Sequence, residues 1–389
     1  METTGPSGPT NNHTPTNDFL LDSIRFGNRD STHGVTKGRK DDVEKSFAKW
    51  VQFTAECEID TFLCTSSFSD KVNIFSGFAY RLRHNFAGHT TRDELRGLSI
   101  RREVFNVSEA FQSYGHPDPI RFGKGLSTKL ARQIRGYITA DPPPIQQAPL
   151  PLSIFENVLD MAISSGEKGI ADLICSALFF GMRSCEYTDT PGMQHKRTTI
   201  LELRDIRFYD KNRDPITHKS LTLSRDAKIV SVRFRRQKNQ MINEMVIQHR
   251  TNSNTMCPVL RLAAIVQRIW SYPNTTKFTS INTLLVNTKL VRIKAKTITK
   301  TLRHTVTQRG QHIGVNQNSI GTHSIRTSFA MLMQLNGAHE TTIMKKGRWL
   351  SSAFLRYIRG YIDQFGGDSS TIIIGPNGEF KSLLGHGNI

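Results

Sequence analysis

The sequence predicts a mainly α-helical protein with one small antiparallel β-sheet, divided into two domains. Apolar residues recur at helical spacing over residues 42–140 and again from residue 152 onward. Between these stretches, residues 141–151 hold five prolines in eleven positions, which excludes a helix and favours an extended spacer. In the second domain, residues 199–236 alternate between apolar and polar side chains, as half-buried strands do. The predicted order is therefore a helical domain, a spacer, and a helical domain that carries the sheet.

Residues 1–41 are expected to form a disordered tail, because residues 1–18 are rich in Thr, Pro, Gly and Asn and almost lack apolar side chains. The basic cluster at residues 37–40 is interpreted as a solvated linker, with a nuclear address or a phosphate-contacting arm as alternatives. Residues 42–140 predict a bundle of four or five short helices, with breaks near Gly77, Gly88, Gly115 and residues 117–119. Basic residues recur along the later part of this stretch, so the bundle is expected to have one basic face.

The second domain begins with helices. Residues 169–180 are almost all apolar and predict a buried helix that ends at Gly181. Arg183 follows at the end of this helix, and Glu186 stands three residues further on, where the two side chains can pair. Further predicted elements are strands at 199–209, 220–224, 229–235 and 244–249, a turn at 237–240 and an amphipathic helix at 259–270.

The composition indicates the class of partner. A chain of 389 residues with a net charge of +19 is expected to bind a polyanion, and DNA or RNA is the default. No apolar run approaches the roughly 18 residues of a membrane-spanning helix, and residues 1–19 do not resemble a signal peptide. The five cysteines form no C-x-x-C pair, which argues against a zinc site and against a disulfide framework. We therefore expect an intracellular protein, nuclear if the cell is eukaryotic.

The last part of the second domain carries reactive side chains in a fixed order. His323 and Arg326 form an H-x-x-R unit, Gly347-Arg348-Trp349 follows, and Tyr357 lies in a segment of helical character. Taken alone, each has an ordinary structural alternative: a helix-start histidine, a core tryptophan and a partly buried tyrosine. Their order and spacing together point to one site.

This order resembles the catalytic domain of tyrosine recombinases, the integrase family of site-specific DNA recombinases. The stretch G-R-W-L-S-S-A-F-L-R-Y-I-R is most similar to the recombinases of Crypton and DIRS-type mobile elements. Trp349 precedes Tyr357 by eight residues, whereas most phage and bacterial members have nine. Tyr361, one helical turn further along the same face, therefore remains a rival nucleophile. The resemblance covers about residues 42–365, and it leaves 366–389 as a C-terminal tail that can contact a neighbouring subunit.

The resemblance implies a role for each matching residue. Arg183 and Arg326 would grip phosphate oxygens with their guanidinium forks, and Glu186 would brace Arg183. His323 would donate to the same phosphate or help to move the tyrosine proton. The other implied catalytic residues are Lys238 as the general acid, Trp349 as a hydrogen-bond donor and packing wall, and Tyr357 as the nucleophile.

The resemblance also divides the chain by role. Residues 42–140 would be the core-binding domain that clamps one side of the duplex, and residues 152–365 the catalytic domain. Residues 289–309 hold seven Lys and Arg without an acid, which favours a helix laid along the duplex over a solvated face. The residues expected to contact DNA are Arg121, Lys124, Lys129, Arg132, Arg235, Arg236, Lys294, Lys296, Lys300 and Arg303.

The implied function is integration or excision of a mobile element through a 3′-phosphotyrosine intermediate, by a homo-tetramer that holds two sites on double-stranded DNA. We expect no metal or other cofactor, because the sequence lacks the clustered carboxylates of two-metal nucleases, a P-loop and H-E-x-x-H. No membrane and no small-molecule substrate are expected either. The alternatives are a type IB topoisomerase, which shares the chemistry, and a DNA-binding protein that does not cut.

Overall fold

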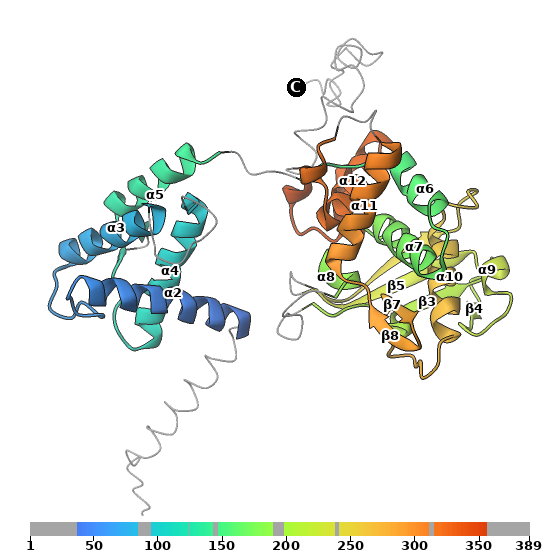
Figure 1. The fold of residues 1–389 in the computed structure, drawn as a ribbon, viewed down its shortest axis with the longest axis horizontal. Helices are drawn as coiled ribbons and strands as arrows, with labels where there is room; N and C mark the ends of the chain where they lie inside the picture. The colour runs from blue at the N-terminus through green and yellow to red at the C-terminus, as the bar shows by residue number, and fades with distance from the viewer. Residues whose placement is uncertain are drawn as a thin grey trace, which may run out of the picture. The chain divides into compact units, whose positions relative to one another are not determined.

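The computed structural model describes residues 37–84, 95–123, 125–142, 147–189, 198–237, 241–310 and 315–355. The chain divides into two compact units, Met1–Pro143 and Pro144–Ile389 (Figure 1). Helices dominate both units and a small antiparallel sheet lies in the second, which confirms the predicted fold class. None of the helices formed by the described residues is long and apolar enough to cross a membrane.

The N-terminal unit is a helical bundle around an aromatic core. Trp50 is fully buried at its centre, where its ring stacks on Phe75 at 4.3 Å between centroids and meets the edge of Phe78 at 5.2 Å. The indole N–H donates to the carbonyl of Thr61 at 2.8 Å, so burial leaves no polar group of Trp50 without a partner. The described elements are α2 (Lys37–Glu56), α3 (Phe68–His84), β1 (Arg121–Phe122), β2 (Gly125–Leu126), α4 (Gly97–Ser113) and α5 (Thr128–Ala140).

Two local expectations for this unit are wrong. Helix α2 begins at Lys37, so the basic cluster forms a helical turn rather than a linker, and Arg39 bonds to Asn106 and Glu109 of α4. Helix α3 continues through Gly77, because the buried residues on either side keep one face in register. A glycine inside a helix costs only about 1 kcal/mol relative to alanine, less than the burial of that face contributes.

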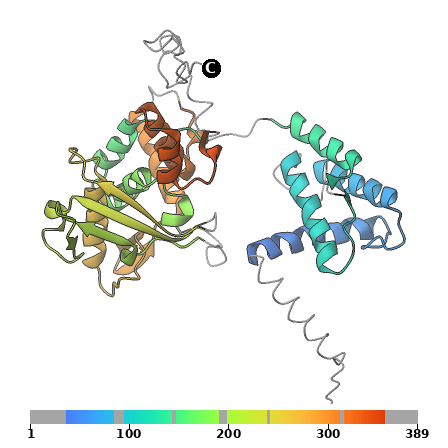
Figure 2. The same ribbon diagram turned by 180° about the vertical axis from the view of Figure 1, so that it is seen from behind.

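The second unit has a layer of helices on one side of a four-stranded sheet (Figure 2). Helix α7 is central, since it packs on α6, α10 and α12 and begins with a capping box between Ser164 and Glu167. It confirms the predicted core helix. The helices are α6 (Leu152–Asp160), α7 (Ser165–Phe179), α8 (Ser184–Tyr187), α9 (Leu223–Asp226), α10 (Pro258–Trp270), α11 (Ala295–Arg309), α12 (Thr322–Leu335) and α13 (Glu340–Gly347).

The sheet has the order β4-β3-β5-β6, with every neighbouring pair antiparallel. Strand β5 buries Val230, Val232 and Phe234 against the helices, and the backbone N–H of Gln237, directly after the strand, donates to the carbonyl of Met241. The strands are β3 (Ile206–Tyr209), β4 (Pro215–Ile216), β5 (Ile229–Arg236) and β6 (Ile242–His249).

Two predicted elements of this unit are wrong. Residues 220–224 form turns and the start of α9, not a strand. The basic stretch 289–309 is not one helix, because residues 289–292 form strand β8 (Lys289–Arg292), paired with β7 (Thr283–Val286). Asn287 and Thr288 both have positive φ, the turn conformation that matches the twist of a tight hairpin. Only the second half of the stretch, α11, is helical.

Candidate active site

Three arginines that are far apart in sequence lie around one buried carboxylate, and two of them pair with it. Glu186 is 1% exposed, and its two oxygens accept from Arg183 Nη1 at 3.0 Å and from Arg348 Nη2 at 2.6 Å. The third arginine, Arg326, bonds to backbone carbonyls next to both partners: Gly181, and Gly347 at 2.5 Å. Because one negative charge faces three positive charges, this cluster carries a net positive charge in a largely buried setting.

The end of α7 determines where Arg183 lies. Gly181 has a φ of +49°, and a Cβ there would meet the Phe329 ring at 2.8 Å, so this turn requires glycine. Arg183 then precedes the short helix α8, which brings Glu186 back to its guanidinium, as the i,i+3 spacing predicts. Glu186 also accepts from the backbone N–H of Arg183 at 2.9 Å. Side chain and backbone of Arg183 are therefore held by the same carboxylate.

Arg183 keeps donors for a ligand. Its Nη1 is shared between Glu186 and Gln237, and its Nη2 donates to the carbonyl of Arg348 at 3.1 Å. A guanidinium has five N–H groups, so Nε–H and one Nη2–H have no partner among the described residues. The side chain is 18% exposed, so it is not sealed from solvent. Nε and Nη2 share one edge of the guanidinium, the edge with which an arginine makes a bidentate phosphate contact.

Arg348 was not predicted as a site residue. Its side chain is fully buried, with Nη1 donating to the carbonyl of Phe180 at 2.8 Å, Nε to Gln237 at 2.9 Å, and Cζ 3.5 Å from the Phe234 ring centroid. Its backbone has a φ of +58°, at the left-handed end of α13. One sequence signal could have found it: Arg348, not Trp349, precedes Tyr357 by nine residues, the interval common among the recombinases that the sequence resembles.

Trp349 forms one wall of the cluster. Its ring centroid lies 4.0 Å from Arg326 Cζ and 6.1 Å from the Phe329 ring centroid. Gly347 makes this position possible, because a Cβ there would stand 1.7 Å from a Trp349 ring carbon. Any larger residue at 347 must displace the indole.

The electrostatics favour an ionised carboxylate. Burial alone would raise the pKa of Glu186, but the charge of Arg348, followed by those of the other two arginines, outweighs it and holds this pKa below its usual value of 4.5. Burial lowers the pKa of Arg348, opposed by the charge of Glu186. An arginine stays protonated after such a shift, so the cluster keeps its full charge at neutral pH.

His323 lies in the first turn of α12 and is half-buried. Its backbone N–H donates to the side chain of Gln147 at 2.7 Å. Because residues three apart share one face of a helix, His323 and Arg326 lie on the same side of α12. The spacing thus places His323 one helical turn before the buried Arg326.

Several predicted residues lie outside the described parts of the chain. They include both candidate nucleophiles and the candidate general acid, so their roles stay predictions, as does that of the C-terminal tail. These residues are Lys124, Lys238, Tyr357 and Tyr361.

The predicted DNA contacts in the second unit do not form a uniform set. Arg235 differs from the others because its guanidinium pairs with Asp205 at 2.9 Å and with Glu202 at 3.0 Å. Acids of the same unit therefore neutralise its charge. Arg303 donates to the carbonyl of Ile320 at 3.0 Å and is half-buried. The remaining predicted contacts of this unit are exposed: Arg236, Lys294, Lys296 and Lys300.

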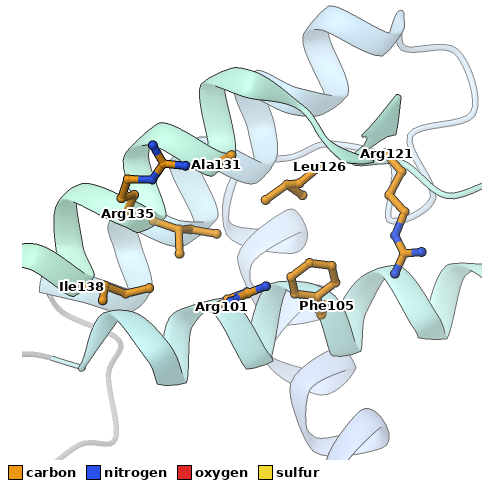
Figure 3. Close-up of a pocket in the computed structure, with 8 residues that line it drawn as sticks. Arg101, Phe105, Arg121, Leu126, Ala131, Arg135 and Ile138 are labelled. Carbon is orange, nitrogen blue, oxygen red and sulfur yellow. The ribbon is translucent and has the colours of Figure 1, made fainter. Parts of the chain in front are cut away.

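The N-terminal unit has its own basic site, a cavity of about 470 Å³ between α4 and α5. Figure 3 shows that its arginines come from three elements and surround apolar side chains. Two of them lie over the same ring, with Arg101 Cζ and Arg121 Cζ each 5.6 Å from the Phe105 centroid. Arg121 also pairs with Asp118 at 3.2 Å, whereas Arg101 and Arg135 form no ion pair with any described residue.

Of this cavity the sequence had assigned only Arg121 to DNA. Two other predicted contacts, Lys129 and Arg132, are exposed on α5 outside the cavity lining, and Lys129 donates to Asn73 at 2.5 Å. Within the described ranges of both units, no group of three or more His, Cys, Asp and Glu could hold a metal ion.

No protein-family model matches the sequence, and no curated protein matches it either. Among solved structures, the chain is similar to the XerH site-specific recombinase bound to palindromic difH substrate in a post-cleavage complex. That similarity has 12% identity and a TM-score of 0.49 over 85% of this chain and 80% of that one. It is also similar to the Tn1549 transposon integrase in complex with transposon right end DNA (11% identity, TM-score 0.40, 76% and 85% of the chains) and to XerA recombinase (15%, 0.35, 87% and 100%).

Proposed function

We propose that the protein is a site-specific DNA recombinase that breaks and rejoins DNA through a 3′-phosphotyrosine intermediate. The observation that carries the proposal is the unused edge of Arg183, held in place by Glu186 within a cluster of net positive charge. A guanidinium that is fixed by a carboxylate and keeps two parallel donors is suited to one phosphate group. The phosphotyrosine bond would keep the energy of the broken phosphodiester bond, so the strands could rejoin without ATP.

In the proposed reaction, the tyrosine oxygen attacks phosphorus and the bond from phosphorus to the 5′-oxygen breaks. Arg183 and Arg326 stabilise the negative charge that develops on the non-bridging oxygens. Tyr357 is the proposed nucleophile, with Tyr361 as its rival, and Lys238 gives the departing 5′-oxygen its proton. His323 takes the tyrosine proton or donates to the phosphate. Attack of a 5′-hydroxyl from another duplex then releases the tyrosine and exchanges the strands.

Double-stranded DNA is the proposed partner of both units. In the N-terminal unit, Arg101, Arg121 and Arg135 would contact phosphates, and the apolar floor of their cavity would contact sugars or base edges. In the second unit, the exposed lysines of α11 would contact the backbone. Integration or excision of a mobile element related to Crypton or DIRS-type elements, by a homo-tetramer on two sites, is the proposed biological reaction.

Covalent trapping tests the chemistry. The full chain is incubated with a nicked duplex that carries the end sequence of its element, so that the cleaved fragment diffuses away and the reaction stops at the adduct. An SDS-resistant adduct in the wild type, lost in Tyr357→Phe and kept in Tyr361→Phe, is the expected result. Loss of the adduct only in Tyr361→Phe would make Tyr361 the nucleophile and leave the proposed reaction unchanged.

The other readings predict different results in the same assay. Absence of an adduct on a site that the protein binds would overturn the proposal in favour of a DNA-binding protein that does not cut. Relaxation of a supercoiled plasmid that lacks any target site would favour a type IB topoisomerase. Arg207→Ala is the matched control, because it removes an exposed arginine of the same unit that is not among the predicted DNA contacts.

A further inference from the structure

Gln237 joins the arginine cluster to the sheet. It follows the last residue of β5, is 1% exposed, and its single amide oxygen accepts from two guanidiniums: Arg183 Nη1 at 3.0 Å and Arg348 Nε at 2.9 Å. Its backbone N–H donates to the carbonyl of Met241, the residue before β6. The residue that bridges the two arginines is therefore fixed from both its side chain and its backbone.

The amide nitrogen of Gln237 is buried without an acceptor among the described residues. The orientation of the amide is set by its oxygen, since only that atom can accept from the two guanidiniums. A buried donor without a partner destabilises the fold, because it has lost its hydrogen bond to water. Glutamate in the same place would offer oxygens to both arginines, form stronger charge-assisted bonds and leave no such donor. Fold stability alone therefore favours glutamate over glutamine at this position.

The neutral charge of Gln237 matters for the binding of an anion. With glutamine at 237, the cluster of Arg183, Arg326, Arg348 and Glu186 has three positive charges and one negative charge. A second carboxylate would halve the net positive charge and compete with a phosphate for Arg183. In a buried setting this competition is strong, because charges interact more strongly there than in water.

We propose that Gln237 is a neutral positioning residue of the phosphate site: its amide oxygen holds Arg183 in the orientation that presents the free guanidinium edge, without cancelling the charge that attracts the phosphate. This inference rests on the proposed function and identifies a residue of that same site. Gln237 acts through Arg183, and it trades stability of the fold for affinity toward an anion.

The test separates stability from anion binding in Gln237→Glu. Thermal unfolding of the full chain is measured with and without inorganic phosphate, against chloride at the same ionic strength, and adduct formation is measured on the nicked duplex. We expect Gln237→Glu to unfold at the same or a higher temperature than the wild type without phosphate. We also expect it to lose most of the stabilisation by phosphate and to form the adduct at least about tenfold more slowly.

A purely structural role of Gln237 predicts that stability and activity change together. Gln237→Met, which keeps the length and the neutral charge but removes the acceptor, should lower both the unfolding temperature and the response to phosphate. A Gln237→Glu protein that responds to phosphate and reacts like the wild type would overturn the inference. So would one whose adduct formation falls only in proportion to a loss of stability.

The two proposals fail in different ways. If the wild type forms no adduct but is stabilised by phosphate, and Gln237→Glu is not, the proposed function is wrong and the role of Gln237 stands. If the wild type forms the adduct and Gln237→Glu forms it at the same rate, the function stands and the inference about Gln237 is wrong. If phosphate stabilises neither protein beyond chloride, the anion site itself is refuted.

Discussion

The basic cavity of the N-terminal unit and the arginine cluster of the second unit use arginine in opposite ways. In the N-terminal unit, Arg101 and Arg135 are exposed at the rim of an apolar cavity and form no ion pair with a described residue. In the second unit, Arg326 and Arg348 are 2% and 1% exposed and bond to backbone carbonyls and to Glu186. An exposed arginine contributes charge that salt can screen, whereas a buried arginine holds its guanidinium in a fixed orientation. The first kind suits attraction to a long polyanion, and the second suits the grip on one phosphate.

The largest effect is expected where a buried arginine is removed. Arg348→Ala would leave Glu186 with one fewer partner in a buried site, and breaking such a pair typically costs about 3–5 kcal/mol. Urea unfolding of the full chain measures the free energy. Arg236→Ala, at an exposed position of the same unit, should stay within about 0.5 kcal/mol of the wild type. Equal losses in both variants would refute the distinction between buried and exposed arginines.

The next effect tests the wall over Arg326. Gly347→Ala would place a methyl group within the present position of the Trp349 ring, so the indole must move off the guanidinium. Such overpacking costs about 1–3 kcal/mol, and adduct formation should fall with it. The control is Gly136→Ala in α5, where a Cβ meets nothing within 4 Å, and a helical alanine should add about 0.5–1 kcal/mol of stability. Unfolding temperature and adduct rate are measured for both.

The rim arginines should affect DNA binding and leave stability unchanged. The double variant of Arg101→Ala and Arg135→Ala removes two charges from the cavity rim. The slope of log affinity against log salt for duplex DNA should fall by about two, because each lost phosphate contact removes about one unit. Arg102→Ala changes the next residue of α4, which does not line the cavity, and is the control. An unchanged slope in the double variant would mean that the cavity does not face DNA.

The smallest effect concerns acid stability. The pKa of Glu186 is held below 4.5, so its carboxylate stabilises the fold above that pH, and this contribution is lost as the pH falls through the lowered pKa. The stability difference between the wild type and Glu186→Gln should therefore shrink below about pH 4.5. Urea unfolding at a series of pH values measures it. A difference that stays constant to about pH 2 would mean that Glu186 does not couple its charge to folding.

The sequence predicted those parts of the fold and site that depend on local pattern. The apolar run before Gly181 located α7, and the spacing of Arg183 and Glu186 predicted their ion pair, because residues three apart meet in a helical turn. The H-x-x-R unit placed Arg326 on the face of α12 that enters the cluster. The structure brings Trp349 to the same place.

The rest depends on contacts between distant segments, which a single sequence does not reveal. Arg348 enters the site because its backbone takes a left-handed conformation that an arginine rarely adopts. Gln237 matters because the end of β5 approaches the end of α13. The error over residues 289–292 has a similar cause, since basic and β-branched residues fit a strand as well as a helix until the turn at Asn287 is recognised.

The hydrogen bonds that join the end of α7 to Arg348 have a consequence for protein synthesis. The hydrogen bond from Arg183 to the carbonyl of Arg348 spans 165 residues, and the one from Arg348 to Phe180 spans 168. A chain emerging from the ribosome therefore contains Arg183 and Glu186 long before it contains the residues that hold them in place. A nascent or prematurely terminated chain that lacks α13 cannot assemble the cluster. Under the proposed function, a fragment that lacks α13 would have no complete phosphate site and would form no adduct with DNA.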